Sequence, residues 1–224
     1  FHIGERDDRI FGPFEEKYMA EEWVDNHCGS QYWTIIKLND KVSVKISKHD
    51  FYDSSIAIFT QNHKILNLND CPLKGEREIK DFKKKHGEFD ILLTQFSYAA
   101  WKGGIDNTEL RQIAAKEKID AMISQAKILN CKFVIPFASY IYFSNKMNFY
   151  MNDSVNKPET VVKELANEKI NSIIMAPEET QNLDSIKQNP HSLEFWKQKF
   201  DLNNKNKEID EYKKSVNLEE LNLN

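Results

Sequence analysis

A carboxylate at the end of a buried strand is the residue of this sequence best placed to do chemistry. The apolar run 65–68 leads into Asp70, and because side chains alternate along a strand, Asp70 continues the face that carries Leu66 and Leu68. A carboxylate in that position is costly unless a metal, a cation or several N–H donors hold it. The alternative is a plain turn at 69–72, because Asn and Asp bond to their own backbone and Pro72 ends the strand.

A second set of candidate metal ligands lies at 47–55, where the sequence SKHDFYDSS predicts a loop. His49, Asp50 and Asp53 stand close together in it. Imidazole and carboxylate groups both suit zinc or iron, so Asp53 and His49 are candidate ligands. The alternative is that these side chains are simply solvated, as loop residues of these types often are.

Polar and aromatic residues follow two later strand ends. Tyr98 and Trp101 come after the apolar run 91–93, and rings in such a place either stack on a sugar or base ring or pack against the next helix. The segment 145–156 is dense in amides and aromatics, and such a loop binds a ligand or closes over a site. Because strand ends meet at one edge of an α/β sheet, we expect four distant side chains to converge on one rim: Asp70, Ser97, Ser139 and Asn152.

The elements that position these residues alternate between strand and helix in the second half of the chain. Hydrophobic periodicity predicts strands at 32–38, 42–46, 55–60, 64–68, 91–95, 132–135 and 173–175, with the first four arranged as two hairpins. The same reasoning predicts helices at 14–27, 78–86, 106–130 and 158–168. We expect the strands from 64–68 onward to lie in one sheet with helix 106–130 packed on it, which makes the fold class α/β.

Helix 106–130 has the clearest pattern of these elements. Asp106 and Glu109 have the spacing of a capping box at its N-terminus. An apolar stripe should turn the helix toward the sheet. The stripe predicted to be buried consists of Leu110, Ile113, Ala114, Met122, Ile123, Ala126 and Leu129.

Composition limits the classes of protein and partner. The chain has 224 residues, of which 40% are hydrophobic and 12% aromatic, enough to bury the core of one domain. A net charge of −4, from 31 basic and 35 acidic residues, leaves no basic face for nucleic acid, which we do not expect as a partner. Three cysteines without a C-x-x-C pair predict neither a disulfide framework nor a cysteine zinc site.

Location and domain limits follow from the remaining segments. Because no apolar run is long enough to span a bilayer and no signal pattern is present, we expect a cytoplasmic protein without a membrane partner. The chain starts at Phe1 rather than Met, and we expect a piece of a longer protein. We expect a partial domain over 1–200 and a polar helix or linker over 201–224, where Asn, Lys and Glu dominate.

Four motifs, in order along the chain, together resemble the distal half of the metallo-β-lactamase-fold family. They are LNLNDC at 66–71, FDILLTQFSYAAW at 89–101, VIPFAS at 134–139 and FYMND at 149–153. The branch that they resemble contains CMP-N-acetylneuraminate hydroxylase and bacterial relatives described as UDP-MurNAc hydroxylases. The resemblance covers about 53–179. It implies an αββα sandwich with flanking helices, in which two sheets pack between helical layers and a site for one or two metals lies at the sheet edges.

The resemblance also implies roles for particular residues. Asp70 falls on the carboxylate that bridges the metals in this family, and Asp53 is a candidate second ligand for zinc or iron. The implied activity is metal-dependent hydrolysis or hydroxylation of a small, nucleotide-linked sugar. The residues expected to contact that substrate are Ser97, Tyr98, Trp101, Ser139, Asn152 and Asp153.

Three departures from the family pattern bear on the metal site. The H-x-H-x-D-H motif that supplies most ligands of the first half is absent, and Asn145 stands where relatives often carry a histidine. An amide oxygen is a poorer zinc ligand than imidazole. The Rieske-type iron–sulfur ligands of the hydroxylase members are also not found in this stretch. We therefore expect the missing N-terminal half of the same fold as a partner that completes the metal site.

Two other interpretations of the same residues stay open. The chain could be a metal-free module that binds a nucleotide sugar, or a component of a hydroxylase, because aromatic and amide-rich rims serve binding as well as catalysis. It could also be a scaffold half that only completes a fold. Metal content separates the enzyme from the other two classes, and stabilisation by a ligand separates the binding module from the scaffold.

Overall fold

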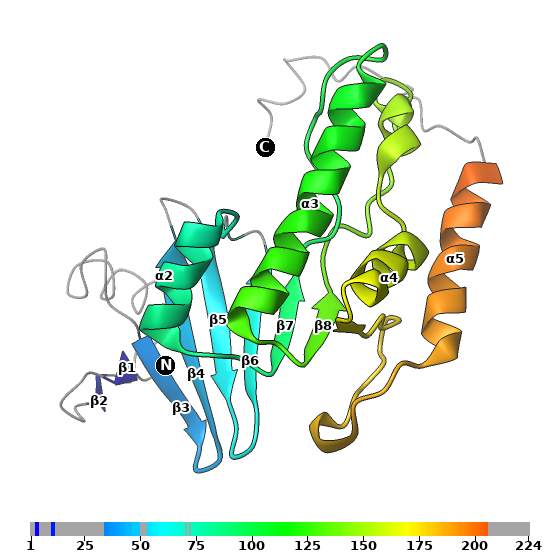
Figure 1. Cartoon of the computed structure of the whole chain (residues 1–224). Coiled ribbons are helices and arrows are strands. Elements are labelled where there is room, and N and C mark those ends of the chain that lie inside the picture. Colours follow the sequence, from blue (N-terminus) through cyan, green and yellow to red (C-terminus); the bar gives the residue numbers. More distant parts are fainter. Residues whose placement is uncertain are drawn as a thin grey trace, which may run out of the picture.

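The computed structural model describes residues 3–4, 10–11, 34–49, 53–69, 71 and 73–205 (Figure 1). One sheet has the order β2-β1-β3-β4-β5-β6-β7-β8-β9, antiparallel from β2 to β6 and parallel from β6 to β9. Its strands are β1 Ile3–Gly4, β2 Ile10–Phe11, β3 Thr34–Asn39, β4 Val42–His49, β5 Asp53–Phe59, β6 Lys64–Asn69, β7 Ile91–Thr94, β8 Phe133–Pro136 and β9 Asn171–Ser172. The predicted helix at 14–27 lies outside the described residues.

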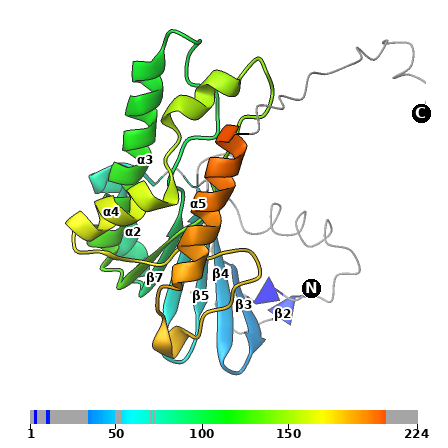
Figure 2. The same cartoon turned by 90° about the vertical axis from the view of Figure 1, so that its right-hand side faces the viewer.

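Helices cover one face and one edge of this sheet. They are α2 Glu76–His86, α3 Thr108–Leu129, α4 Pro158–Asn167 and α5 Pro190–Lys205, with the short 3-10 helices η2 Phe149–Ser154 and η3 Leu183–Ser185. Figures 1 and 2 show α2, α3 and α4 on one face, whereas α5 lies at the β9 edge. The predicted α/β class is confirmed. A sheet with a helical layer on one face is the arrangement that one half of an αββα sandwich has.

The predicted boundary between residues 1–200 and 201–224 falls within α5. This helix continues through Lys205, past the predicted limit at 200, and residues 206–224 lie outside the described part. No helix among the described residues is long and apolar enough to cross a membrane.

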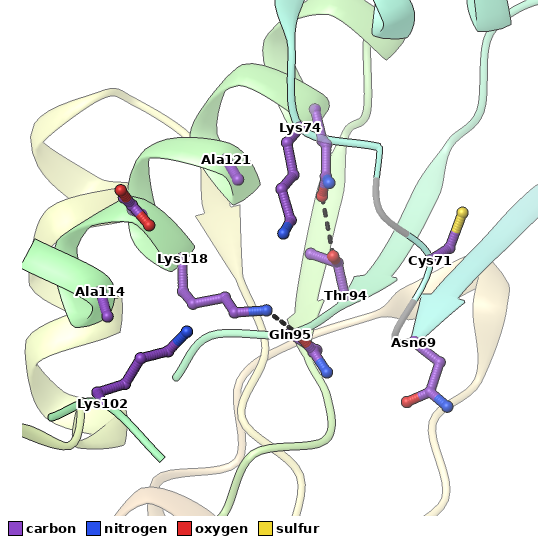
Figure 3. A pocket seen from close by; sticks show the side chains of 11 residues that line it. Asn69, Cys71, Lys74, Thr94, Gln95, Lys102, Ala114, Lys118 and Ala121 are labelled. Carbon is purple, nitrogen blue, oxygen red and sulfur yellow. Dashed lines mark hydrogen bonds between the residues drawn. The ribbon is translucent and has the colours of Figure 1, made fainter. Parts of the chain in front are cut away.

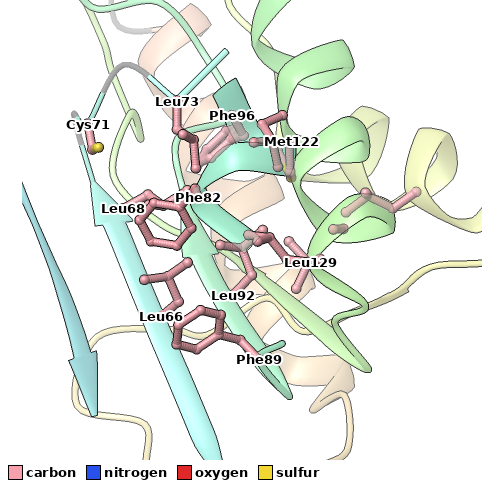
Figure 4. Packing of buried hydrophobic residues seen from close by; sticks show 14 of the residues in the cluster. Leu66, Leu68, Cys71, Leu73, Phe82, Phe89, Leu92, Phe96, Met122 and Leu129 are labelled. Atoms are coloured by element: carbon pink, nitrogen blue, oxygen red, sulfur yellow. The ribbon is translucent and has the colours of Figure 1, made fainter. Parts of the chain in front are cut away.

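The main core lies between the sheet and α2, α3 and α4. Leu66 and Leu68 of β6 are fully buried, as the alternation predicted. Leu66 lies opposite Leu92 of β7, which in turn lies opposite Val134 of β8, and Figure 4 shows this layer against side chains from the helices. Because apolar side chains align across all three parallel strands, burial fixes their register and brings their C-terminal ends to the same edge.

The opposite face of the antiparallel strands is apolar as well, but it is less covered. Ile46 and Ile56 face each other across β4 and β5 and remain exposed, while Val44, Ile58 and Ile65 form a half-buried row beside them. Apolar β-branched residues in neighbouring strands give a flat surface that another layer can pack against.

Residues 47–49 and 53–55 of the segment predicted as a loop belong instead to the sheet, and for these residues the prediction was wrong. Residues 50–52 lie outside the described part of the chain. β4 continues to His49 and β5 begins at Asp53, so the two residues lie opposite each other in the antiparallel register. Ser47 and Ser55 are buried on the helical face of these strands. Small polar residues that alternate with apolar ones can continue a strand, which the sequence argument did not allow for.

For α3, the predicted capping box was wrong, and the predicted apolar stripe was wrong in its N-terminal part. The helix begins at Thr108 with Asn107 as N-cap and without a capping box, because the Asn107 side chain accepts a hydrogen bond from the Gly104 amide (2.9 Å) instead. Leu110 and Ile113 of the predicted stripe are 53% and 49% exposed. Relative to the predicted stripe, the buried face of the helix is rotated so that it includes the charged Arg111 and the polar Gln125. The buried residues are Arg111, Ala114, Ala115, Ile119, Met122, Gln125, Ala126 and Leu129.

The last strand is shorter than predicted and displaced toward the N-terminus. β9 covers Asn171–Ser172 rather than 173–175, while Ile173 and Ile174 are buried beyond it. The Gln188 side chain accepts a hydrogen bond from the Ile174 amide (2.7 Å) and donates one to its carbonyl (3.1 Å). A side-chain amide thus takes the place that a neighbouring strand would have had. Three of the four segments predicted to share one sheet do so, and the fourth place is taken by β9, which precedes the predicted segment.

Candidate functional site

The C-terminal ends of β6, β7 and β8 lie side by side and form what we call the carboxyl edge. Asn69, Thr94 and Pro136 are neighbours in the register of the three strands. Open α/β sheets bind ligands at this end of their parallel strands. The backbone there is strained, because Asn69 (φ 41°), Ala138 (φ 58°) and Ser139 (φ 68°) have left-handed conformations. Such strain costs about 1–3 kcal/mol per residue and concentrates at binding and active sites.

A pocket of about 130 Å³ opens at the carboxyl edge, between β6, β7 and α3. We call it the lysine pocket. Its lining consists of Asn69, Cys71, Lys74, Thr94, Gln95, Lys102, Ala114, Glu117, Lys118, Ala121 and Gln125. Figure 3 shows the side chains of Lys74, Lys102 and Lys118 extending toward the same space beside Gln95 and Thr94. The pocket therefore collects cations from three separate segments of the chain.

The base of the lysine pocket is a buried polar bridge. Thr94 donates a hydrogen bond through Oγ1 to Gln125 Oε1 (2.8 Å), and Gln125 Nε2 donates to the carbonyl oxygen of Leu73 (2.6 Å). Thr94 and Gln125 are both buried, so each of these partners offsets a desolvation cost of about 1–3 kcal/mol. The bridge fixes Leu73 against β7 and α3, and thereby sets the position of the adjacent Lys74.

The wall formed by α3 follows from helical spacing. Ala114, Lys118, Ala121 and Gln125 recur at three- and four-residue intervals, so they share one face of the helix. The two alanines leave room for the pocket. Lys118 donates a hydrogen bond to Gln95 Oε1.

The charges around the lysine pocket are unequal. Lys74, Lys102 and Lys118 face it, and Glu117 is the one acidic residue among the described residues of its lining. Among the described residues, the ammonium groups of Lys74 and Lys102 have no hydrogen-bond or ion-pair partner. In the described part of the lining, ammonium groups therefore outnumber carboxylates by three to one.

The candidate metal ligands lie at the neighbouring strands. His49 Nε2 is 2.9 Å from Ser55 Oγ, and the imidazole stacks on Phe82 with ring centroids 5.5 Å apart. Burial lowers the pKa of His49, against the opposing charge of Glu78. Asp53 is half-buried and faces His49 across the strands. The neutral imidazole that results is the form that could hold a metal.

The donors in the described part of the chain do not fit a complete metal site. Asp70 lies outside the described residues, and no group of three or more His, Cys, Asp or Glu side chains within them could hold an ion. Burial raises the pKa of the Cys71 thiol to about 12, so this neighbour of Asp70 stays protonated and sits in the apolar core. A metal at this edge would need Asp70 together with ligands from elsewhere.

Four of the predicted substrate contacts lie around η2 rather than in the lysine pocket. Ser97 and Tyr98 are buried; Ser97 Oγ accepts a hydrogen bond from the Asn156 amide (3.0 Å), and the Tyr98 hydroxyl donates to the Met151 carbonyl. Asn152 holds its own loop, because its side chain accepts from the Phe143 amide (2.9 Å) and donates to the Phe143 carbonyl (2.8 Å).

Asp153, the fourth of these residues, is held by a buried arginine. Arg111 is 0% exposed and donates from Nε to Asp153 Oδ1 (2.8 Å) and from Nη2 to Oδ2 (2.6 Å). These hydrogen bonds hold the pKa of Asp153 below its usual value. Thr108 Oγ1 adds a third hydrogen bond to the carboxylate (3.1 Å). The geometry is that of a bidentate structural ion pair.

The other two predicted substrate contacts are apart from this group. Trp101 is 70% exposed at the surface. Ser139 lies in the strained turn after β8, and its buried Oγ has no hydrogen-bond partner in the described part of the chain. The structure thus brings Ser97, Tyr98 and η2 together, but it places none of the six predicted residues in the lining of the lysine pocket.

The lysines were missed by reasoning from the sequence. Lys74, Lys102 and Lys118 stand singly among many charged residues, so no local motif marks them. The available signal was the spacing of small and polar residues at 114, 118, 121 and 125, which breaks the apolar stripe expected of a helix that covers a sheet.

Comparisons with known proteins give only a distant likeness. Neither a protein-family model nor a curated protein matches this chain. The chain is similar to CmlA, a diiron β-hydroxylase from Streptomyces venezuelae, with a TM-score of 0.40 and 9% identity over 62% of this chain and 31% of that chain. It is also similar to a mutant of the CmlA β-hydroxylase, with a TM-score of 0.37 and 12% identity over 62% and 30% of the two chains. The matched part spans less than a third of those proteins, and at these scores the likeness extends at most to the fold.

Proposed function

We propose that this chain is part of a metal-dependent hydrolase or hydroxylase of the metallo-β-lactamase fold, with its active site at the carboxyl edge and a small, nucleotide-linked sugar as substrate. The observation that carries the proposal is the position of the lysine pocket. It opens at the ends of parallel strands, and its lining includes Asn69 and Cys71, the two chain neighbours of Asp70. The strained backbone at Asn69, Ala138 and Ser139 supports an active site at the same edge.

The proposal gives each part of the chain a limited task. Asp70 is a metal ligand, and the remaining ligands come from outside the described residues, because the described donors do not complete a site. The polar bridge from Thr94 through Gln125 to Leu73 holds the segment after Asp70 in place. The lysine pocket binds a part of the substrate that is not itself altered.

The missing N-terminal half of the fold is the proposed source of those ligands. In a sandwich, a second sheet packs on the face that helices leave open. The apolar face that includes Ile46, Ile56 and Ile58 has the chemistry that this packing requires. A second sheet on this face would end near the carboxyl edge and could deliver histidines to Asp70.

Elemental analysis of the full-length protein tests the proposal. After dialysis against a weak chelator, the wild-type protein should retain zinc or iron, and Asp70→Asn, which removes the charge and keeps the shape, should lose most of it. Asp81→Asn, an exposed carboxylate of α2, is the matched control and should retain the metal. Equal metal in the wild type and Asp70→Asn would mean that Asp70 is not a ligand.

A second candidate function is a metal-free module that binds nucleotide sugars. The lysine pocket favours it, because cations suited to a phosphate need no metal. A wild-type protein that retains no metal but is stabilised by a nucleotide sugar would support this function over the enzyme.

A further inference from the structure

We infer that the lysine pocket is a binding site for a single oxyanion of the phosphate type, held by Lys74, Lys102 and Lys118. The inference deepens the proposed function, since it assigns a ligand class to the same pocket. The anion would be a part of the ligand other than the one altered at the metal site, and its binding requires no metal. The evidence is the convergence of the three ammonium groups on one enclosed space (Figure 3).

The charge of the pocket selects an anion. Among the described residues of the lining, three lysines face one glutamate. Like charges that converge in a pocket repel one another unless a counter-charge lies between them. Because Lys118 donates to Gln95 and is anchored on α3, its ammonium group is directed toward the pocket rather than into bulk solvent. An anion with several oxygens can accept hydrogen bonds from all three lysines at once.

The volume of the pocket limits the ligand to a small group. Sites that enclose a whole drug-sized ligand measure roughly 300–1,000 Å³. A pocket of about 130 Å³ has room for one phosphate-sized group. A larger ligand would place its phosphate here and leave the remainder at the carboxyl edge, toward Asn69. Lysine suits this task, since it binds phosphate as a point charge.

The position of the lysines is set by the fold rather than by chance contact. Lys74 follows the segment that Gln125 fixes through the Leu73 carbonyl. Lys102 precedes Gly103, whose carbonyl accepts a hydrogen bond from the Tyr150 hydroxyl (3.0 Å). Lys118 lies within α3. Each ammonium group is therefore carried by a backbone that the core holds in place, as a preorganised site requires.

Calorimetric titration of the full chain with inorganic phosphate, in EDTA and at constant ionic strength, tests the inference without a metal. The double variant Lys74→Ala/Lys102→Ala should bind phosphate about tenfold more weakly than the wild type, or worse. The control Lys163→Ala/Lys187→Ala makes the same change in net charge outside the pocket and should bind like the wild type. Glu117→Gln removes the one opposing charge and should bind more tightly, a gain that misfolding cannot produce.

The outcomes are decisive in both directions. No phosphate binding by the wild type, or equal affinity in the pocket and control double variants, overturns the inference. Titration with uridine diphosphate separates the sources of the phosphate: tighter binding than inorganic phosphate indicates a nucleotide-linked ligand, and equal binding indicates free phosphate. Loss of metal in Asp70→Asn does not depend on these lysines. A failure of the anion site is therefore distinguishable from a failure of the metal site.

Discussion

Two groups of cations lie along α3, and they differ in how many of their members are paired by described residues. Near the N-terminus of the helix, Arg111 donates to Asp153, to the carbonyls of Gly104 (2.6 Å) and Ile105 (3.1 Å), and to Thr108 Oγ1 (2.9 Å). The Tyr150 ring stacks on the guanidinium, with Arg111 Cζ 4.9 Å from the ring centroid. Two turns further on, Lys118 joins Lys74 and Lys102 at a pocket whose described lining contains a single carboxylate.

The difference indicates which charges build the protein and which are left for a ligand. A buried arginine must have all of its donors paired, because an unpaired charge in the interior costs several kcal/mol. The pairing with Asp153 ties η2 to α3 and the preceding loop, so this carboxylate has a structural task. Its predicted contact with a substrate stays a prediction. Lysines at an open pocket keep their hydration and can exchange it for an anion.

Substitution of Arg111 should have the largest effect on stability. Arg111→Met should lower the free energy of unfolding by about 3–5 kcal/mol, because it removes the partner of Asp153 and the donor to the carbonyls of Gly104 and Ile105. Arg111→Lys keeps the charge but not the planar fork, and should recover only part of the loss. Urea denaturation measures both. A loss below about 1 kcal/mol in Arg111→Met would show that the ion pair does not hold η2 to α3.

Acid should weaken the same ion pair. The pKa of Asp153 is lowered in the folded state by the hydrogen bonds from Arg111, so its stabilising effect is fully present above the unfolded value of 3.8 and is lost as the pH falls below it. The wild type should therefore lose more stability between pH 5 and pH 3 than Asp153→Asn, which cannot titrate. Parallel pH profiles of the melting temperature for the two proteins would contradict this assignment.

Removal of the lysines should have the smallest effect on stability. Lys74→Ala/Lys102→Ala should change the free energy of unfolding by no more than about 0.5 kcal/mol, because neither ammonium group pairs with a described residue and truncation relieves repulsion in the pocket. Urea denaturation in the absence of phosphate gives the value. A loss as large as that of Arg111→Met would mean that these lysines are structural and would remove the contrast between the two groups.

The local pattern of the sequence by itself determined most of the elements. The alternation in 64–68 placed Leu66 and Leu68 in the core, and helical periodicity located α2, α3 and α4 within two residues at each end. Both hairpins were predicted from their turns. These features depend on neighbours in the chain, and a period of two or 3.6 residues is visible in any short segment. The same reasoning predicted a site at the carboxyl edge, where the lysine pocket opens.

Only the tertiary structure decided which side chains meet. Arg111 and Asp153 are 42 residues apart, and the lysine pocket joins residues from the ends of two strands and from one helix. The rotation of α3 that buries Arg111 and Gln125, and exposes Leu110 and Ile113, follows from partners that those residues find elsewhere in the fold. Hydrogen bonds and packing between distant segments outweigh local hydrophobicity there, since an unpaired buried polar group costs more than an exposed isoleucine. Which of these two costs is larger depends on residues that are close in space but distant in sequence, and a local sequence pattern does not show them.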